Sequence, residues 1–146
     1  MIQRYFDATY LGKLHWLEPG SQEVTACAIA ADELVCALHG GAEFYSIGHR
    51  KIRESLATPA TVRAVFIQFQ TDCASGQIRL LPLTESIMQR VEAIFTHAPA
   101  TTYLRAADAL HLATAAEHGF TEIYSNDKHL LVAAPLFGLV GVNVIP

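Results

Sequence analysis

The feature that most constrains the fold is the alternation of short β-type segments with longer helix-type segments. The expected strands cover residues 3–6, 34–38, 79–83, 122–125 and 142–145. Between them apolar residues recur at helical spacing, as in Ile87, Val91 and Phe95. Such alternation favours βαβ units and a parallel sheet covered on both faces. We therefore expect an α/β, three-layer fold with a central parallel sheet of about five strands flanked by helices.

The bulk of the sequence suits one compact domain, residues 1–146. Hydrophobic residues make up 51% and charged residues 16%, which favours a sizeable core over disorder. No apolar run approaches the roughly 18 residues of a membrane span. The first residues lack the apolar stretch of a signal peptide. The sequence therefore predicts a cytoplasmic protein with no membrane segment.

Local signals set several helix ends. Thr58 before Pro59 predicts a helix cap followed by proline at the first helical position. Thr84 before Glu85 repeats the capping pattern, with an acid near the positive end of the helix. Gly119 is expected to end a helix that begins near residue 102.

The three cysteines, Cys27, Cys36 and Cys73, are odd in number and widely separated, with no C-x-x-C pair. This pattern argues against a disulfide framework or a cysteine zinc site. Buried, unpaired thiols are the expected state.

The formal net charge of −4 excludes a broad basic surface for phosphate binding. The one concentrated basic stretch is His49-Arg50-Lys51-Ile52-Arg53. It is either a solvated helix face or a strip that attracts phosphates, with Arg50 and Lys51 as substrate-binding candidates.

Two aspartates follow expected strands. Asp7 comes directly after the first strand, and Asp127 comes two residues after the fourth. Aspartate is also a favoured helix cap, so each residue alone is explained by the helix that follows it. In an open parallel sheet, however, ligands bind beyond the carboxyl ends of the strands.

Asp108 and Glu43 complete the set of candidate acids. Asp108 interrupts an almost wholly apolar helical segment, on the stripe defined by Leu104 and Leu112. A buried carboxylate must protonate, pair or bind a cation, and Arg105 or His111 could supply a structural pair. Glu43 is expected in the first turn of a helix, where an acid is favourable without any further role.

Taken together, the four carboxylates predict a metal site. Clustered carboxylates repel one another unless cations intervene. A site built only from oxygen ligands suits Mg²⁺ or Mn²⁺ rather than zinc. Such ions activate water and polarise a phosphoryl oxygen, which is the chemistry of phosphodiester hydrolysis.

The chain resembles the PIN-domain family, specifically the VapC-type toxins of bacterial toxin–antitoxin pairs. The opening Tyr5-Phe6-Asp7-Ala8-Thr9-Tyr10-Leu11 resembles the first family motif, a strand ending in aspartate. Glu43-Phe44-Tyr45-Ser46 resembles the second, although Gly40-Gly41-Ala42 precedes it where relatives more often carry β-branched or hydroxyl residues. The segment from Leu104 to Ala113 is close to the third motif, and Ser125-Asn126-Asp127 matches the last.

The resemblance spans essentially the whole chain. It implies a PIN-like fold and a metal-dependent endoribonuclease, inhibited by a cognate antitoxin and assembled as a homodimer. The metal-binding and catalytic set would be Asp7, Glu43, Asp108 and Asp127, with Ser125 near a ligand carboxylate or the scissile phosphate. His111 is expected to pack or to support a ligand rather than act as the general base.

Three other functions compete with this interpretation. A haloacid-dehalogenase-like phosphatase needs a second acid two residues after the first, where this chain has Thr9. A receiver domain needs an aspartate after the third strand, where Leu83 and Thr84 stand instead. A PIN-fold module that binds RNA or a partner without cleaving it is the alternative that the acids alone do not exclude.

Overall fold

The computed structural model describes residues 1–146. Its five strands are β1 (Gln3–Tyr5), β2 (Glu33–Ala37), β3 (Ile78–Leu81), β4 (Glu122–Tyr124) and β5 (Val140–Val142). Strand β2 pairs in parallel with both β1 and β3, and β4 pairs in parallel with β5. A single parallel bridge between Phe6 and Tyr124 joins the two groups. The spatial order is therefore β3-β2-β1-β4-β5, all parallel, as the sequence predicted.

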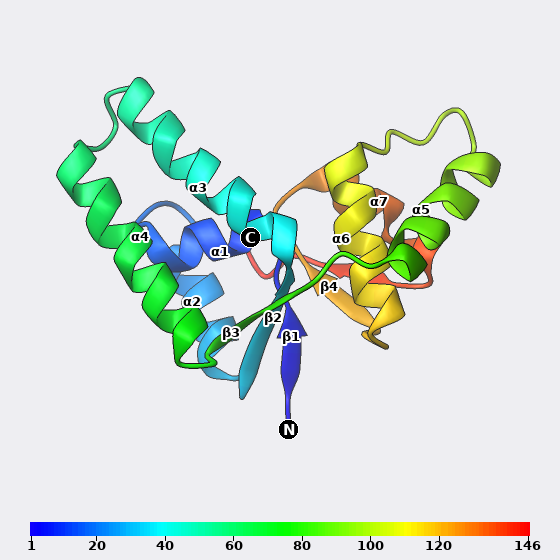
Figure 1. The fold of residues 1–146 in the computed structure, drawn as a ribbon, viewed down its shortest axis with the longest axis horizontal. Coiled ribbons are helices and arrows are strands. Elements are labelled where there is room, and N and C mark those ends of the chain that lie inside the picture. The colour runs from blue at the N-terminus through cyan, green and yellow to red at the C-terminus, as the bar shows by residue number, and fades with distance from the viewer.

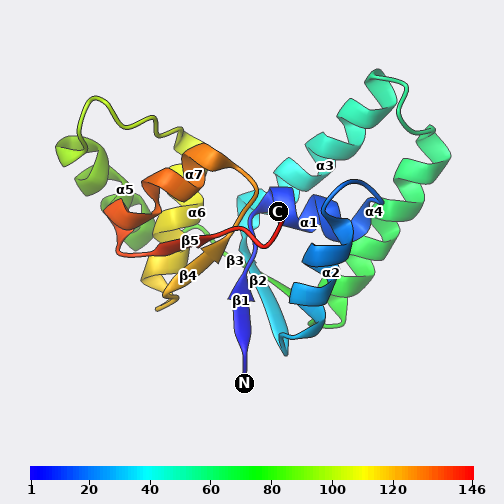
Figure 2. The ribbon, with the colours of Figure 1, turned by 180° about the vertical axis from the view of Figure 1, so that it is seen from behind.

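Seven α-helices and one 3₁₀ helix flank the strands. They are α1 (Ala8–His15), α2 (Ser21–Ile29), α3 (Leu38–Arg53), α4 (Pro59–Ala74), α5 (Glu85–His97), α6 (Ala106–Glu117), α7 (Lys128–Ala133) and η1 (Ala134–Phe137). Helices α1 to α4 lie on one side of the strands and α5 to α7 on the other (Figure 1). The view from behind shows the same division (Figure 2). The expected three layers are confirmed.

Each face of the sheet has its own hydrophobic core, because successive strand residues point to opposite faces. Tyr5 and Val35 belong to the cluster that packs against α5, α6 and α7. Their neighbours Phe6 and Cys36 belong to the other cluster, with Phe44 of α3 and Phe69 of α4. The rings of Phe44 and Phe69 stack with centroids 4.1 Å apart. Burial on both faces explains why the central strand β2 is continuously apolar from Leu34 to Ala37 rather than alternating.

The predicted caps of two helices are confirmed. The Thr58 hydroxyl accepts a hydrogen bond from the backbone N–H of Thr61, with Pro59 at the first helical position. The Thr84 hydroxyl accepts one from the N–H of Ile87. Gly119 follows the end of α6 in a left-handed conformation, with φ of +78°.

Three boundaries differ from the prediction. Helix α6 begins at Ala106 rather than near residue 102, because Arg105 is still extended. Strand β5 ends at Val142 rather than continuing to residue 145. Beyond it, the Tyr10 hydroxyl donates to the side-chain oxygen of Asn143 and accepts the N–H of Val144, both at 2.7 Å. These bonds draw the chain towards α1 instead of along β4.

The third difference concerns α3, which begins at Leu38, five residues before Glu43. Glu43 therefore lies in the second turn, and the N-terminal dipole does not account for it. Two glycines within the helix, Gly40 and Gly41, were expected to precede it.

No helix of the protein has the length and apolar character to cross a membrane.

Candidate active site: an acidic pocket at the strand ends

The four candidate acids meet at one pocket. Asp7, Glu43, Asp108 and Asp127 come from four separate parts of the chain, yet all line a single cavity of about 410 Å³. The lining also includes the cationic side chains of Arg50 and Arg105 and the imidazole of His111. The pocket lies where β1 and β4 end, as expected for a parallel sheet.

Asp7 combines a structural and a site position. Its carboxylate caps α1 by accepting the N–H of Tyr10 at 3.1 Å, and it also accepts the hydroxyls of Thr9 and Ser125 at 2.6 and 2.5 Å. Only 3% of the residue is exposed. Burial raises the pKa of Asp7 above its ordinary value, although His111 and the three hydrogen bonds oppose that shift.

Ser125 links two of the aspartates and is fully buried. Its hydroxyl donates to Asp7 and accepts the backbone N–H of Asp127 at 2.9 Å. The neighbouring N–H of Asn126 donates to the Thr9 hydroxyl at 3.1 Å. This hydroxyl pair fixes the loop after β4 against the loop after β1, and so sets the position of Asp127 relative to Asp7.

Asp127 also caps a helix while facing the pocket. One of its oxygens accepts the N–H groups of His129 and Leu130 at the start of α7. The other oxygen pairs with the guanidinium of Arg105. Asp7 and Asp127 therefore each cap a helix and line the pocket at the same time.

Asp108 lies in the first turn of α6 with its side chain only 10% exposed. The Nε of Arg105 donates to it at 3.0 Å, so the structural pair anticipated from the sequence is present. Burial raises the pKa of Asp108, the charge and hydrogen bond of Arg105 lower it, and the nearby Asp127 adds to the rise. A single guanidinium thus bridges Asp108 and Asp127 at the mouth of the pocket.

Glu43 is held by a chain of buried hydrogen bonds. The Ala37 N–H donates to the Tyr5 hydroxyl at 3.0 Å, and that hydroxyl lies 2.8 Å from Nδ1 of His111. Nε2 of His111 lies 2.6 Å from the Glu43 carboxylate. Burial alone would raise the pKa of Glu43, but His111, His39 and Arg105 outweigh it and lower that pKa. His111 therefore supports an acid, as the sequence suggested.

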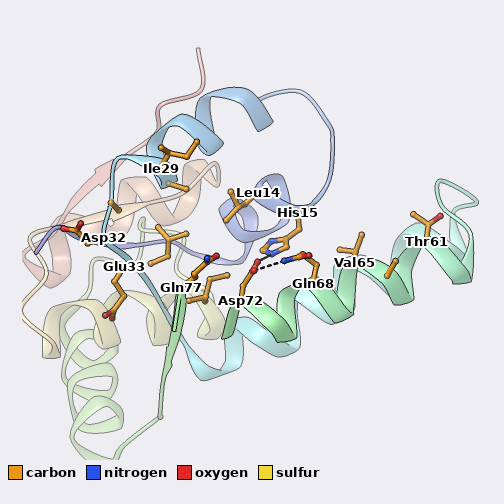
Figure 3. A pocket seen from close by; sticks show the side chains of 15 residues that line it. Leu14, His15, Ile29, Asp32, Glu33, Thr61, Val65, Gln68, Asp72 and Gln77 are labelled. Carbon is orange, nitrogen blue, oxygen red and sulfur yellow. Dashed lines mark hydrogen bonds and ion pairs between the residues drawn. The ribbon is translucent and has the colours of Figure 1, made fainter. Parts of the chain in front are cut away.

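A second, larger pocket lies away from these acids. It has a volume of about 770 Å³ and lies between α1, α2, α4 and the starts of β2 and β3. Leu14, Ile29 and Val65 give it an apolar lining, and Asp72 is bound within it to His15 and Gln68 (Figure 3). It contains none of the candidate acids.

The comparisons decide the family. A family model described as PIN domain matches residues 14–134. The chain belongs to the PIN-domain family. A search of curated proteins found no significant sequence match.

Three solved structures share the fold. The VapC20 toxin of Mycobacterium tuberculosis, described as cleaving the sarcin–ricin loop, has a TM-score of 0.69 at 12% identity, over 88% of this chain and 93% of that one. FitAB bound to an IR36 DNA fragment has a TM-score of 0.71 at 16% identity, over 97% and 95%. FitAcB of Neisseria gonorrhoeae has a TM-score of 0.65 at 15% identity, over 96% of each chain.

The donor set of this PIN domain fits a divalent metal. PIN domains usually bind one, and every donor that the four acids offer is a carboxylate oxygen, the type that Mg²⁺ and Mn²⁺ prefer. The guanidinium held between Asp108 and Asp127 shows that this part of the pocket stabilises a cation.

Arg50 and Lys51 are separated by the structure. Arg50 lines the acidic pocket of the PIN domain. Lys51 points away from it, with its ammonium 3.1 Å from Glu18 and 4.9 Å from the centre of the Trp16 ring. Of the two, only Arg50 is placed to meet a phosphate that enters the pocket.

Three further residues support the acids of the site in ways that the sequence did not predict. His39 lies four residues before Glu43, and a search for i, i+4 pairs would have found it. Arg105 was noted only as a partner of Asp108, and its second contact, with Asp127, depends on tertiary structure. The sequence indicates only a core position for Tyr5, because nothing in it shows that the Tyr5 hydroxyl reaches His111.

One of the two glycines before Glu43 that depart from the family pattern, Gly40, has a packing reason. A Cβ on Gly40 would lie 2.3 Å from Sγ of Cys36 and 3.1 Å from Cε1 of His111. Gly40 therefore lets α3 approach β2 and leaves room for the imidazole that holds Glu43.

Gly40→Ala is expected to lower the free energy of unfolding by about 1–3 kcal/mol, the usual cost of overpacking, despite the better helix propensity of alanine. Urea unfolding measures this change. Gly41→Ala is the matched control, since its Cβ would make only an ordinary contact of 3.5 Å with Leu80. Equal stabilities for the two variants would contradict the packing explanation.

Arg105→Gln is expected to raise the affinity for Mn²⁺ about fivefold, because it removes the internal cation that competes for Asp108 and Asp127. Two partly exposed ion pairs are worth roughly 1 kcal/mol, and about 1.4 kcal/mol corresponds to a factor of ten. Calorimetric titration measures the affinity without any need for catalysis. Arg90→Gln, which removes an arginine paired with Glu117 elsewhere, should leave it unchanged. Weaker binding by Arg105→Gln would show instead that Arg105 organises the site.

Proposed function

We propose that this PIN domain is a metal-dependent endoribonuclease and the toxin of a toxin–antitoxin pair. The observation that carries the proposal is the convergence of Asp7, Glu43, Asp108 and Asp127 on one pocket that also contains Arg50 and Arg105. Four acids from four segments would repel one another without cations, so their convergence is costly unless it serves binding. The proposed cofactor is Mg²⁺ or Mn²⁺.

Each residue has a defined part in this proposal. Asp7, Glu43, Asp108 and Asp127 hold the ions, which when bound activate water and polarise the scissile phosphoryl group. Ser125 and Thr9 orient the carboxylate of Asp7 through their hydroxyls. Tyr5 and His111 orient that of Glu43. Arg50 attracts and positions the phosphate of the RNA.

The proposed partners are RNA, a cognate antitoxin and a second copy of the chain. Support comes from the shared fold of VapC20, FitAB and FitAcB. A purified preparation must therefore be freed of any bound antitoxin before its activity is measured.

The test is cleavage of total cellular RNA by the purified protein, with Mg²⁺, with Mn²⁺ and with EDTA, alongside Asp7→Asn. Cleavage that requires the metal and is lost in the variant would support the nuclease. The alternative is a PIN-fold module that binds RNA or a partner without cutting, which the occupation of the pocket mouth by Arg105 favours. A folded protein that cuts in neither metal would favour that alternative.

Arg50→Ala is expected to weaken RNA binding and to reduce the salt dependence by about 0.7, the slope contributed by one contact with a single strand. Binding to a labelled RNA at several salt concentrations, in the presence of Ca²⁺ to prevent turnover, gives the slope. Arg53→Ala is the control, because Arg53 is exposed on the same helix and does not line the pocket. Identical slopes for the two variants would show that Arg50 does not contact the RNA phosphates and is only part of the solvated face of α3.

A further inference from the structure

Two histidines lie against one of the proposed catalytic acids. His39 and Glu43 are one turn apart on α3, and His111 faces them from α6. Nε2 of His111 lies 2.6 Å from a Glu43 oxygen, and Nε2 of His39 lies 3.6 Å from the same oxygen. One potential ligand atom from each residue lies within 4.8 Å of the other two.

We propose that His39, Glu43 and His111 form a second cation site, which takes a late transition metal such as Zn²⁺. Two imidazole nitrogens and one carboxylate oxygen are ligands that suit zinc, whereas the other three acids offer oxygen alone. The two sites share Glu43, so the inference rests on the proposed function only for that shared role. Zinc bound here draws Glu43 away from the other three acids and weakens the binding of Mg²⁺ to them.

The spacing requires little movement of the ligands. Bonds of about 2.0–2.2 Å in a tetrahedral site place ligand atoms roughly 3.3–3.6 Å apart. The three candidate ligand atoms lie within 4.8 Å of one another, so the side chains need to shift by about an ångström, and His111 and Glu43 are already closer because they share a hydrogen bond. The cation takes the place of the proton in that bond, and the proton leaves to solvent.

The surroundings of both imidazoles also suit a bound cation. A metal-ligating histidine usually donates its other N–H to an oxygen, which fixes the ring. Nδ1 of His111 has such a partner in the Tyr5 hydroxyl, which is itself held by the N–H of Ala37. Nε2 of His39 donates in the same way to the carbonyl oxygen of Ala107, 3.0 Å away, and Nδ1 of His39 is buried without any hydrogen-bond partner. Nδ1 is therefore the nitrogen of His39 that is free to bind the cation.

The entry path is open on the side of Glu43. Its side chain is 36% exposed and lines the acidic pocket, whereas the side chain of His111 is only 2% exposed. A cation therefore reaches Glu43 and His111 through the same pocket as the substrate. Water from the pocket can supply the fourth ligand that a site of three protein ligands leaves open.

A titration with Co²⁺ tests the site. Co²⁺ bound to nitrogen in a four- or five-coordinate geometry absorbs visible light strongly, whereas six-coordinate Co²⁺ bound only to oxygen absorbs it weakly. The full-length protein is titrated with Co²⁺ as wild type, as His39→Gln and as His49→Gln. His49 is an exposed histidine of the same helix, outside the cluster, and serves as the matched control. Zn²⁺ is then added to displace the Co²⁺.

We expect an absorption band in the wild type and in His49→Gln that Zn²⁺ abolishes. His39→Gln should lose the band and bind Zn²⁺ at least about tenfold more weakly, since even a partner of a ligand is worth that factor. No band in the wild type, or a band that survives in His39→Gln, would overturn the site. A band in the wild type together with no RNA cleavage in Mg²⁺ would support this site and contradict the proposed nuclease. RNA cleavage in Mg²⁺ without a band would support the nuclease and contradict this site.

Discussion

Asp108→Asn is expected to lower the rate of metal-dependent RNA cleavage at least about 100-fold. A lost neighbour of a metal ligand already costs 10–100-fold, and Asp108 is proposed as a ligand itself. The amide keeps the shape of the side chain but removes its charge from the pocket. Cleavage of a labelled RNA under single-turnover conditions, at saturating Mg²⁺, measures the rate.

The same substitution should leave the metal-free fold intact. The pair with Arg105 is half exposed on the arginine side, and such pairs contribute roughly 0–1 kcal/mol. The raised pKa of Asp108 shows that its charge is disfavoured by burial, so the neutral amide also removes a cost. Unfolding free energies within about 1 kcal/mol of the wild type are expected.

Asp72→Asn is the matched control for activity. Its side chain is 16% exposed and binds a basic partner, His15, in the larger pocket away from the four acids. This variant should cut RNA at the wild-type rate. If Asp108→Asn did the same, Asp108 would not belong to the catalytic set, and its burial would have only the structural explanation of its pair with Arg105.

Tyr5→Phe is expected to be the most destabilising of the conservative substitutions near the site. It leaves the N–H of Ala37 and Nδ1 of His111 without their shared partner in a fully buried place. An unsatisfied buried group costs about 1–3 kcal/mol. Urea unfolding of the metal-free protein measures the loss, and Tyr103→Phe, at an exposed tyrosine, is the control.

Tyr5→Phe also separates stability from positioning. Because the Tyr5 hydroxyl holds His111, and His111 holds Glu43, the variant should cut RNA more slowly even when it is fully folded. A variant that is less stable but cuts at the wild-type rate would show that the hydroxyl supports the core and not Glu43.

The sequence alone predicted the layers of the fold and the four acids that line one pocket. Local rules suffice for the layers and for several helix ends: apolar runs of strand length between helical periods predict a covered parallel sheet, and Thr58 and Thr84 show the chemistry of helix caps. Asp7 and Asp127 follow strands, and parallel strands bring such positions to one edge. That expectation needs no knowledge of side-chain contacts.

Only the tertiary structure decided how the acids are held and which basic groups join them. Arg105 reaches Asp127 across 22 residues of chain, and the Tyr5 hydroxyl reaches His111 across 106. Arg50 and Lys51 are adjacent in sequence, but successive helical residues point about 100° apart, so one enters the pocket and the other packs on Trp16. Contacts of this kind depend on how the helices pack together in three dimensions. The local sequence carries no signal for the distance between side chains on different helices.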